Sequence, residues 1–192
     1  MINKKLFQQL LADYINYSSK RHQIIKDSSD ALRLSKQAIF SMHRDDMKIA
    51  GKLIKDVENI FANFQTYFKR DASLRREGAF RAALEEYAEA KFFYNVLAGK
   101  KIDFLEEEEL NYESYLCAIC DLTGELVRKA VNQATKRKFR EVEKYRDTVE
   151  EIIGELIKLN LNNGHLRSKF DDAKRNLRRL EEMLYDIKIK RG

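Results

Sequence analysis

The stretch IIKDSSDALRLSKQAIFSM at residues 24–42 decides the fold. It contains neither glycine nor proline, and its small or apolar residues recur at intervals of three and four. These positions are Ile24, Ser28, Ala31, Ser35, Ala38 and Met42. Such spacing places side chains on one face of an α-helix. Because no Gly or Pro interrupts the chain from about Asn3 to Met42, the pattern predicts one helix roughly 60 Å long.

The same kind of stripe recurs in the next two segments. Asp45 or Asp46 can cap a second helix. Its apolar positions are Met47, Ala50, Ile54, Val57, Phe61, Phe64 and Phe68. A third helix is predicted from about Ser73 to Ala98. It stops at Gly99, because glycine readily adopts the left-handed backbone that ends many helices.

Three more helices follow an acidic connector. The fourth is predicted from about Asn111 to Ala134, with one apolar side and one polar side. The fifth follows a basic turn and ends near Asn162. Its stripe is Val142, Tyr145, Val149, Ile152, Leu156 and Leu159. The sixth carries Leu166, Phe170, Ala173, Leu177, Leu180, Leu184 and Ile187 on its seam. Short turns between long helices predict an antiparallel bundle.

The composition agrees with an all-α fold. Proline is absent from the 192 residues and glycine occurs only seven times, so almost nothing breaks a helix. A hydrophobic content of 44% is enough for a core. No repeat, linker or low-complexity tract divides the chain. We therefore expect a single domain over residues 1–192, with six to seven helices, the seventh being a short one in the acidic connector.

Neither a secretory signal nor an apolar run of roughly 20 residues is present. A cytoplasmic protein with no membrane contact is expected. The two cysteines, Cys117 and Cys120, lie three apart on one helix, which gives poor disulfide geometry and suits a reducing compartment. We expect them to pack rather than to bind zinc, because a structural zinc site needs four ligands and the chain has no second CxxC.

Charge is unevenly distributed along the chain. The net charge of +6 and the pI near 9.2 suit an anionic partner, although many surfaces with no such role have a similar excess. Residues 102–113 hold acids and no bases, whereas residues 165–192 are predominantly basic. This segregation suggests that different faces of the protein have different roles.

Two acids on the third helix, Glu86 and Glu89, are three residues apart and project from the same face. Their neighbours there are apolar: Ala82, Phe93 and Val96. Neither acid has a Lys or Arg three or four residues away, whereas Glu85 has Arg81 and is expected to form an ordinary solvated pair. A carboxylate among apolar groups loses hydration, so it needs a cation or a proton.

Asp121 and Glu125 form a second acidic pair, four residues apart on the fourth helix. Four oxygen ligands without histidine suit Mg²⁺, or Mn²⁺, better than zinc. Gly124 is unfavourable inside a helix, and its missing side chain beside Asp121 would let another helix or a ligand come close. The alternative is that all four acids lie on solvated faces, because periodicity does not show that the two helices face each other.

Two alternative interpretations of the helical bundle involve no RNA cleavage. A di-iron carboxylate bundle requires Glu three residues before each His. Residues of other types stand there, namely Ser19, Phe40 and Asn162 before His22, His43 and His165. A purely structural bundle would bind no metal at its acids.

Two motifs resemble the translin family, most closely its catalytic branch, the translin-associated factor X. EYAEA at 86–90 resembles the family's EYxEA, and DLTGELVR at 121–128 resembles its DLTGELxR. Residues 24–44 and 159–192 also resemble the family's opening and closing helices, so the resemblance covers most of the chain.

The resemblance implies a site and an activity. Glu86, Glu89 and Asp121 take the places of the family's catalytic acids that hold magnesium, and Glu125 that of an accessory acid. It implies a metal-dependent endoribonuclease that acts on single-stranded or short RNA, inside a closed homo-octameric shell with its active sites on the inner wall. The basic residues that it assigns to RNA binding are Arg75, Arg81 and Arg128.

A non-catalytic translin-like protein that holds single-stranded DNA or RNA is the alternative, although a pure binder has no reason to keep the acid set. The chain departs from the family pattern at Ser29, where an arginine is usual, and it lacks the long insertion before DLTGEL. This compactness suggests an archaeal protein. Apolar residues off the stripes are candidates for subunit contacts. They are Ile25, Phe40, Phe92 and Tyr185.

Overall fold

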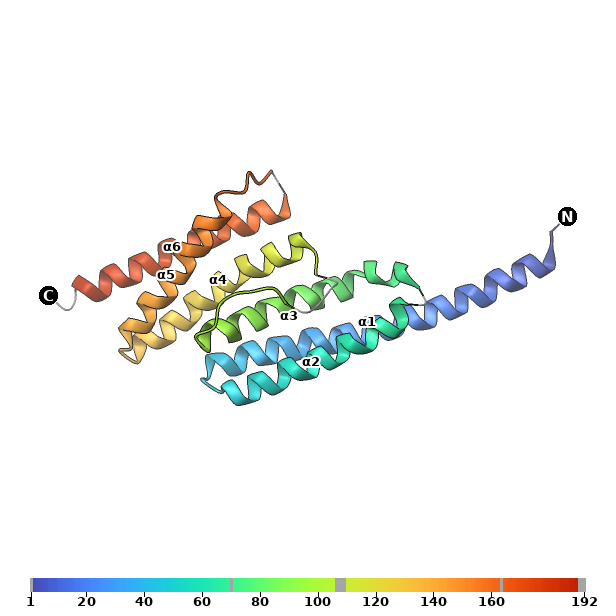
Figure 1. Cartoon of the computed structure of the whole chain (residues 1–192), viewed down its shortest axis with the longest axis horizontal. Coiled ribbons are helices and arrows are strands. Elements are labelled where there is room, and N and C mark those ends of the chain that lie inside the picture. Colours follow the sequence, from blue (N-terminus) through green and yellow to red (C-terminus); the bar gives the residue numbers. More distant parts are fainter. Residues whose placement is uncertain (1, 70, 106–109, 163, 190–192) are drawn as a thin grey trace.

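The computed structural model describes residues 2–69, 71–105, 110–162 and 164–189, and in these ranges the chain forms helices and no strand. The elements are α1 (Lys4–His43), α2 (Met47–Phe68), the short 3₁₀ helix η1 (Ala72–Arg76), α3 (Gly78–Leu97), α4 (Tyr112–Thr135), α5 (Phe139–Leu156) and α6 (His165–Ile189). Figure 1 shows these helices running back and forth along the molecule. The predicted all-α class is thus confirmed.

Polar side chains cap the helices where the sequence supplies them. Asp46, one of two predicted caps, accepts a hydrogen bond from the Ile49 amide at 3.0 Å. Asn111 caps α4 in the same way, accepting from the Ser114 amide at 2.9 Å. After α3, Gly99 adopts the left-handed backbone predicted for it, with φ +70°.

The predicted core face of α1 is confirmed. All six predicted positions of this face are fully buried. The stripe of α2 is also buried, except for the half-buried Met47. The phenylalanines of this stripe pack with Phe80 of α3, whose ring centroid lies 5.3 Å from that of Phe64. Aromatic packing therefore joins α2 to the start of α3.

Two predicted boundaries were wrong. The third helix does not run unbroken from Ser73, because Glu77 adopts extended backbone (φ −61°, ψ 126°) between η1 and α3. The fifth helix ends at Leu156, so Leu159 lies beyond it and is 40% exposed. Gly78 at the first break and Asn160 after the second both disfavour helix, and the prediction did not take them into account. The expected short seventh helix is not seen at residues 100–105 and 110–111, and Glu106–Glu109 lie outside the described residues.

The helices form two sets of three that meet at one seam. α1 packs against α2 and α3, and α6 packs against α4 and α5. The main contact between the sets is that of α3 with α4. The EYAEA and DLTGELVR motifs lie on these two helices, so the fold brings both motifs to the same seam.

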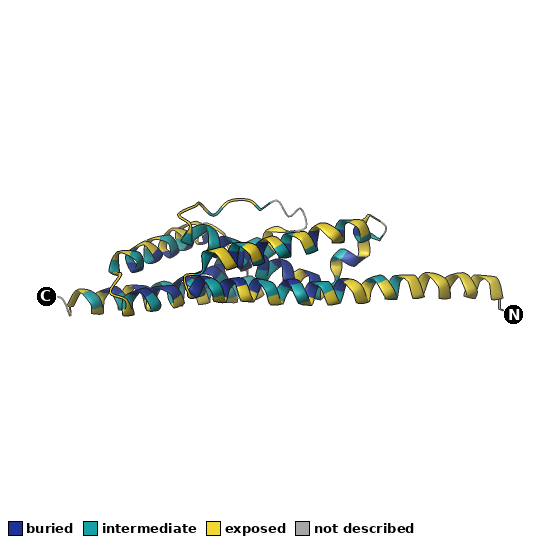
Figure 2. Cartoon of the chain, turned by 90° about the horizontal axis from the view of Figure 1, so that it is seen from below, coloured by how far each residue is buried: buried dark blue, intermediate teal, exposed yellow. Residues whose placement is uncertain are grey.

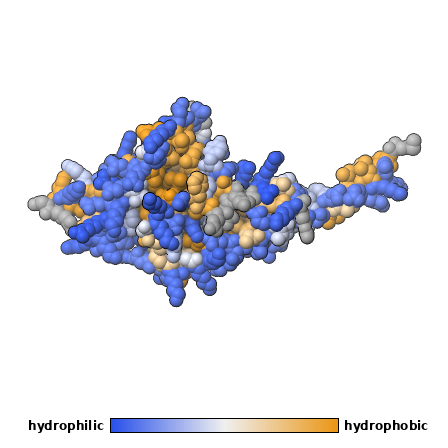
Figure 3. Space-filling model, in the orientation of Figure 1, coloured by the Kyte–Doolittle hydropathy of each residue, from blue (hydrophilic) through white to orange (hydrophobic). Residues whose placement is uncertain are grey.

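The first turns of α1 project from the rest of the protein as an arm (Figure 2). Its apolar side chains are more than half exposed and give the arm an apolar surface (Figure 3). They are Ile2, Leu6, Phe7, Leu10, Leu11, Tyr14 and Ile15. These residues were not among those predicted for subunit contacts. No helix in the described ranges is long and apolar enough to cross a membrane.

Of the apolar residues predicted off the stripes, Phe92 was placed wrongly. It is fully buried and its ring centroid lies 6.0 Å from that of Tyr115 on α4, so it belongs to the core of the seam. Ile25 is half-buried, while Phe40 and Tyr185 are 53% and 66% exposed. The three exposed or half-exposed residues remain candidates for subunit contacts.

Candidate active site

The structure brings the four predicted acids together at the seam between α3 and α4. Glu86 and Glu89 lie on α3, and Asp121 and Glu125 lie on α4. Each acid of α3 is close enough to both acids of α4 for their charges to raise its pKa. The pairing within each helix follows from residue spacing, and the packing of α3 on α4 makes one cluster of the two pairs.

Glu89 is the most perturbed member of this acid cluster. Burial raises the pKa of Glu89 to about 9, and the charges of Asp121, Glu86 and Glu125 add to the rise. Lys169 opposes it only weakly. A carboxyl group in this setting holds its proton at neutral pH unless a cation is present. Glu89 is therefore the point at which the cluster most needs positive charge.

Glu86 has a partial counter-charge from α1. The Nζ atom of Lys36 lies 3.7 Å from its carboxylate, and the Lys36 side chain is 60% exposed. Burial still raises the pKa of Glu86, although Lys36 lowers it, because Asp121 and Glu125 add to the effect of burial. An exposed lysine at this distance is a weak partner. The charge of Glu86 thus remains largely uncompensated.

Asp121 pairs with a lysine that the sequence analysis did not identify. Lys169 of α6 donates a hydrogen bond to the Asp121 carboxylate, and its Nζ atom lies 3.4 Å from Glu85. The predicted pairing of Glu85 with Arg81 is therefore replaced by one with Lys169. The cause is tertiary: α6 packs on α4 and brings Lys169 to the seam, while the Arg81 side chain is exposed.

Glu125 is held by a buried histidine. The Nε2 atom of His43, the last residue of α1, is hydrogen-bonded to the Glu125 carboxylate. The His43 side chain is only 4% exposed, and its ring packs on Phe93 at 5.1 Å. His43 was not predicted to belong to the site. Its position could have been predicted from periodicity, because it continues the buried face of α1 four residues after Ile39.

The apolar surroundings expected for the α3 acids are found in part. Phe93 is fully buried and Val96 is half-buried, but Ala82 is exposed and contributes nothing to the setting. The expected role of Gly124 is not supported either. A Cβ atom there would meet Asn176 of α6 at 3.6 Å, an ordinary contact distance. No close approach of another helix therefore requires glycine at this position.

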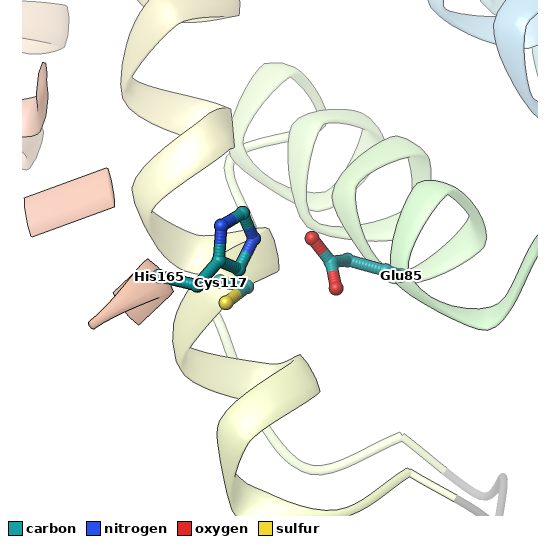
Figure 4. Close-up of side chains that lie close together, drawn as sticks. All are labelled: Glu85, Cys117 and His165. Atoms are coloured by element: carbon teal, nitrogen blue, oxygen red, sulfur yellow. The ribbon is translucent and has the colours of Figure 1, made fainter. Parts of the chain in front are cut away.

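A second group of ligand-type side chains lies beside the acid cluster. The ligand atoms of Glu85, Cys117 and His165 all lie within 4.8 Å of one another (Figure 4). In the described part of the chain, the four acids do not form such a closed group. Like charges repel, and His43 and Lys169 hold two of the acids toward other helices.

Both cysteines are free and buried, as expected from their spacing. Burial raises the pKa of Cys117 to about 11 and that of Cys120 to about 12. A thiol of high pKa is a poor nucleophile at neutral pH. Neither cysteine is therefore a candidate for nucleophilic catalysis.

The three predicted basic residues are spread over different elements. Arg128 is 53% exposed and lies 3.7 Å from Glu125, so it borders the acid cluster. Arg81 is exposed on α3, eight residues and thus about 12 Å before Glu89 along the helix. Arg75 lies in η1, with its guanidinium 5.1 Å from the centre of the Phe68 ring. Of the three, Arg128 is the one that the structure places beside Glu125 of the acid cluster.

Comparisons with known proteins agree on one family. The sequence model described as "Translin family" matches residues 19–191. Translin of Gallus gallus is 32% identical over 81 residues, covering 42% of this chain and 35% of that protein. The translin-associated protein X homolog of Schizosaccharomyces pombe is 31% identical over 133 residues, covering 61% and 57%. The chain thus spans about a third to somewhat over half of these relatives' lengths.

Two solved structures share the fold over nearly the whole chain. The crystal structure of apo-NeC3PO has a TM-score of 0.85 at 26% identity, covering 96% of this chain and 97% of that chain. The structure of AfC3PO with duplex RNA has a TM-score of 0.86 at 19% identity, with coverage of 96% and 97%. At 19% identity the second likeness is one of fold alone.

Proposed function

The chain belongs to the translin family, and from this premise we propose that it is a metal-dependent endoribonuclease that cleaves single-stranded or short RNA inside a closed homo-oligomer. The observation that carries the proposal is the acid cluster. Its central member, Glu89, has a pKa raised to about 9 by burial and by three neighbouring acids. Perturbed groups of this kind concentrate at functional sites.

Magnesium, or manganese, fits the donor set of the cluster. Glu86, Glu89 and Asp121 offer only carboxylate oxygens, which are the ligands that these hard cations prefer. Lys36 compensates Glu86 only weakly, and Lys169 is hydrogen-bonded to Asp121, so neither lysine neutralises Glu89. A divalent cation would supply the missing charge and let Glu89 ionise at neutral pH.

When bound, the metal supplies Lewis-acid stabilisation of phosphoryl charge and lowers the pKa of a coordinated water. The chain supplies the remaining groups. Glu125 accepts a proton from the attacking water, and its hydrogen bond to His43 fixes the orientation of its carboxylate. Arg128, at the edge of the cluster, neutralises a phosphate oxygen of the substrate.

RNA is proposed to bind through its phosphates rather than its bases. Arg75, Arg81 and Arg128 are the basic residues assigned to this contact by the family resemblance. Phosphate contacts give little sequence preference and a steep dependence on salt. Replacing Arg81 by Ala should reduce the slope of log affinity against log salt by about one contact. An unchanged slope would remove Arg81 from the binding surface.

A closed shell, a homo-octamer by the family resemblance, would protect the cell's own RNA from an indiscriminate nuclease. The exposed apolar arm of α1 supports subunit contact, because monomeric proteins seldom expose large contiguous apolar patches. Light scattering at micromolar concentration should show the octamer. A monomer with undiminished cleavage would contradict the proposed shell but not the proposed metal site.

The central test is cleavage of labelled RNA by the purified protein. The assay should include both single-stranded and duplex RNA as substrates, since the structure of AfC3PO has been solved with duplex RNA. We expect cleavage in Mg²⁺ and none after EDTA. Asp121→Asn should abolish it, and Asp147→Asn, which changes an exposed acid of α5, should not. Binding without cleavage under all conditions would select the alternative, a non-catalytic protein that holds single-stranded DNA or RNA.

A further inference from the structure

We propose that Glu85, Cys117 and His165 form a second metal site, suited to zinc and separate from the acid cluster. The three side chains come from α3, α4 and α6 and converge on one point (Figure 4). Their ligand atoms all lie within 4.8 Å of one another. Residues 32 and 48 positions apart in the sequence thus meet at the end of the seam where α6 begins.

The donor set distinguishes this site from the acid cluster. One sulfur, one imidazole nitrogen and one carboxylate oxygen are the ligand types of zinc, whereas magnesium takes oxygen ligands. Zinc binds sulfur at about 2.3 Å and nitrogen at about 2.0–2.1 Å, so ligands of one tetrahedral ion lie roughly 3.5 Å apart. Small side-chain rotations would therefore close the group around an ion. The fourth position is left for water.

Charge balance favours a divalent ion at this point. A thiolate and a carboxylate together neutralise the two charges of zinc. Lys169 lies 3.4 Å from Glu85 and is also hydrogen-bonded to Asp121. Because Asp121 already holds this lysine, zinc at Glu85 need not leave the ammonium group without a partner. Lys169 thus stands between the two sites and keeps them separate.

The site would tie together the two sets of helices. His165 is the first residue of α6, a helix that packs on α4 and α5. Glu85 lies on α3 in the other set. A metal shared by both would fix the start of α6 to α3 through bonds that side-chain packing does not supply. Zinc bound there, with its fourth position open, is therefore expected to stabilise the packing between the two sets at the edge of the active site.

This proposal revises the expectation that both cysteines only pack. That expectation rested on the absence of a second CxxC that could complete a set of four ligands. Cys120 is buried and does not join the group. Only Cys117 does, with partners supplied by the tertiary fold. Three protein ligands and an open position are enough to bind zinc.

Cobalt(II) titration of the metal-stripped full chain tests the proposal. Co²⁺ substitutes for zinc and gives a near-ultraviolet charge-transfer band only when a thiolate is bound. We expect the band in the wild type at one equivalent per chain, and also in Glu125→Gln, which changes the acid cluster and leaves Lys169 paired with Asp121. Zinc should displace the cobalt and raise the melting temperature. No RNA is involved, so failure here is distinguishable from failure of the nuclease proposal.

Matched variants locate the site. Cys117→Ser should abolish the band, while Cys120→Ser, which changes an equally buried cysteine on the same helix, should keep it. His165→Ala should weaken binding at least about ten-fold, and His22→Ala should leave it unchanged. Both histidines are exposed, so these two variants should fold normally. A wild type without the band, a band that survives in Cys117→Ser, or an unchanged cobalt affinity in His165→Ala would overturn the proposal.

Discussion

Two ionisable side chains with reduced exposure to water, the half-buried Glu89 and the buried Lys129, have opposite electrostatic surroundings. The Lys129 side chain is 3% exposed, and its Nζ atom donates to the Met42 carbonyl at 2.5 Å and to Asp45 at 2.7 Å. Hydrogen bonds from Lys129 and Lys136 lower the pKa of Asp45 to about 2. Burial and like charges instead raise that of Glu89 to about 9.

The difference separates a structural charge from a functional one. Lys129 lies on the buried face of α4 and caps the C-terminus of α1, where a cation is favoured by the helix dipole. The Met42 carbonyl and the Asp45 carboxylate together compensate the charge of Lys129. Three acids and the more weakly acting Lys169 are the charged neighbours of Glu89, so the folded chain alone does not compensate it. An uncompensated buried acid lowers stability and is expected where a ligand completes the site.

The largest expected effect concerns cleavage. Glu89→Gln keeps the shape of the side chain and removes a proposed metal ligand, so the rate of RNA cleavage should fall at least about 100-fold. Asp45→Asn, at the structural charge, should leave the rate within about two-fold. Single-turnover cleavage in Mg²⁺ measures both. Equal losses in the two variants would erase the proposed distinction between the regions.

The next largest effect concerns the free energy of unfolding of the metal-free protein. The unfolded pKa of Glu89 is near 4.5 and the folded one is about 9, so the folded protein holds an extra proton between these values. The free energy of unfolding of the wild type must then fall as pH rises through this window. In EDTA at pH 7, Glu89→Gln should be more stable than the wild type by about 1–3 kcal/mol.

Urea unfolding at one protein concentration gives this difference. At pH 4 the difference between Glu89→Gln and the wild type should be much smaller, because Glu89 is then mostly protonated in both the folded and the unfolded state. Saturating Mg²⁺ should stabilise the wild type and leave Glu89→Gln nearly unchanged. If the variant were less stable than the wild type in EDTA, the carboxylate of Glu89 would be compensated by the protein itself.

Asp45→Asn should lower the free energy of unfolding, whereas Glu89→Gln should raise it. The folded pKa of Asp45 lies below its unfolded value, so its contribution is present above about pH 4 and is lost as pH falls through about 2. Asp45 is 47% exposed and solvent screens its charge, so the variant should lose only about 1 kcal/mol at pH 7. Asn tolerates the backbone there, which has φ +65°. Thermal melts from pH 2 to pH 7 measure the loss.

The outcome at these positions shows what sequence can predict. The buried face of α1 followed from one long run without Gly or Pro, because local periodicity alone determines such a face. The acid pairs followed from spacing within α3 and within α4. His43 and Lys169 did not, because they reach the site from helices 82 and 48 residues away in the sequence. Compensation of a charge is a tertiary property, and local spacing does not encode it.

The smallest effect tests whether the acid cluster needs the space beside Asp121. Gly124 lies three residues after it, and an added Cβ would be in ordinary contact with Asn176 at 3.6 Å. Gly124→Ala should therefore raise the free energy of unfolding by about 0.5–1 kcal/mol, as alanine favours helix, and leave cleavage unchanged. Gly154→Ala is the matched control, since no atom lies within 4 Å of a Cβ there. Urea unfolding and cleavage rates of both variants decide the matter. Slower cleavage in Gly124→Ala alone would mean that bound RNA or metal uses that space, and the functional region would then extend along α4 toward Lys129.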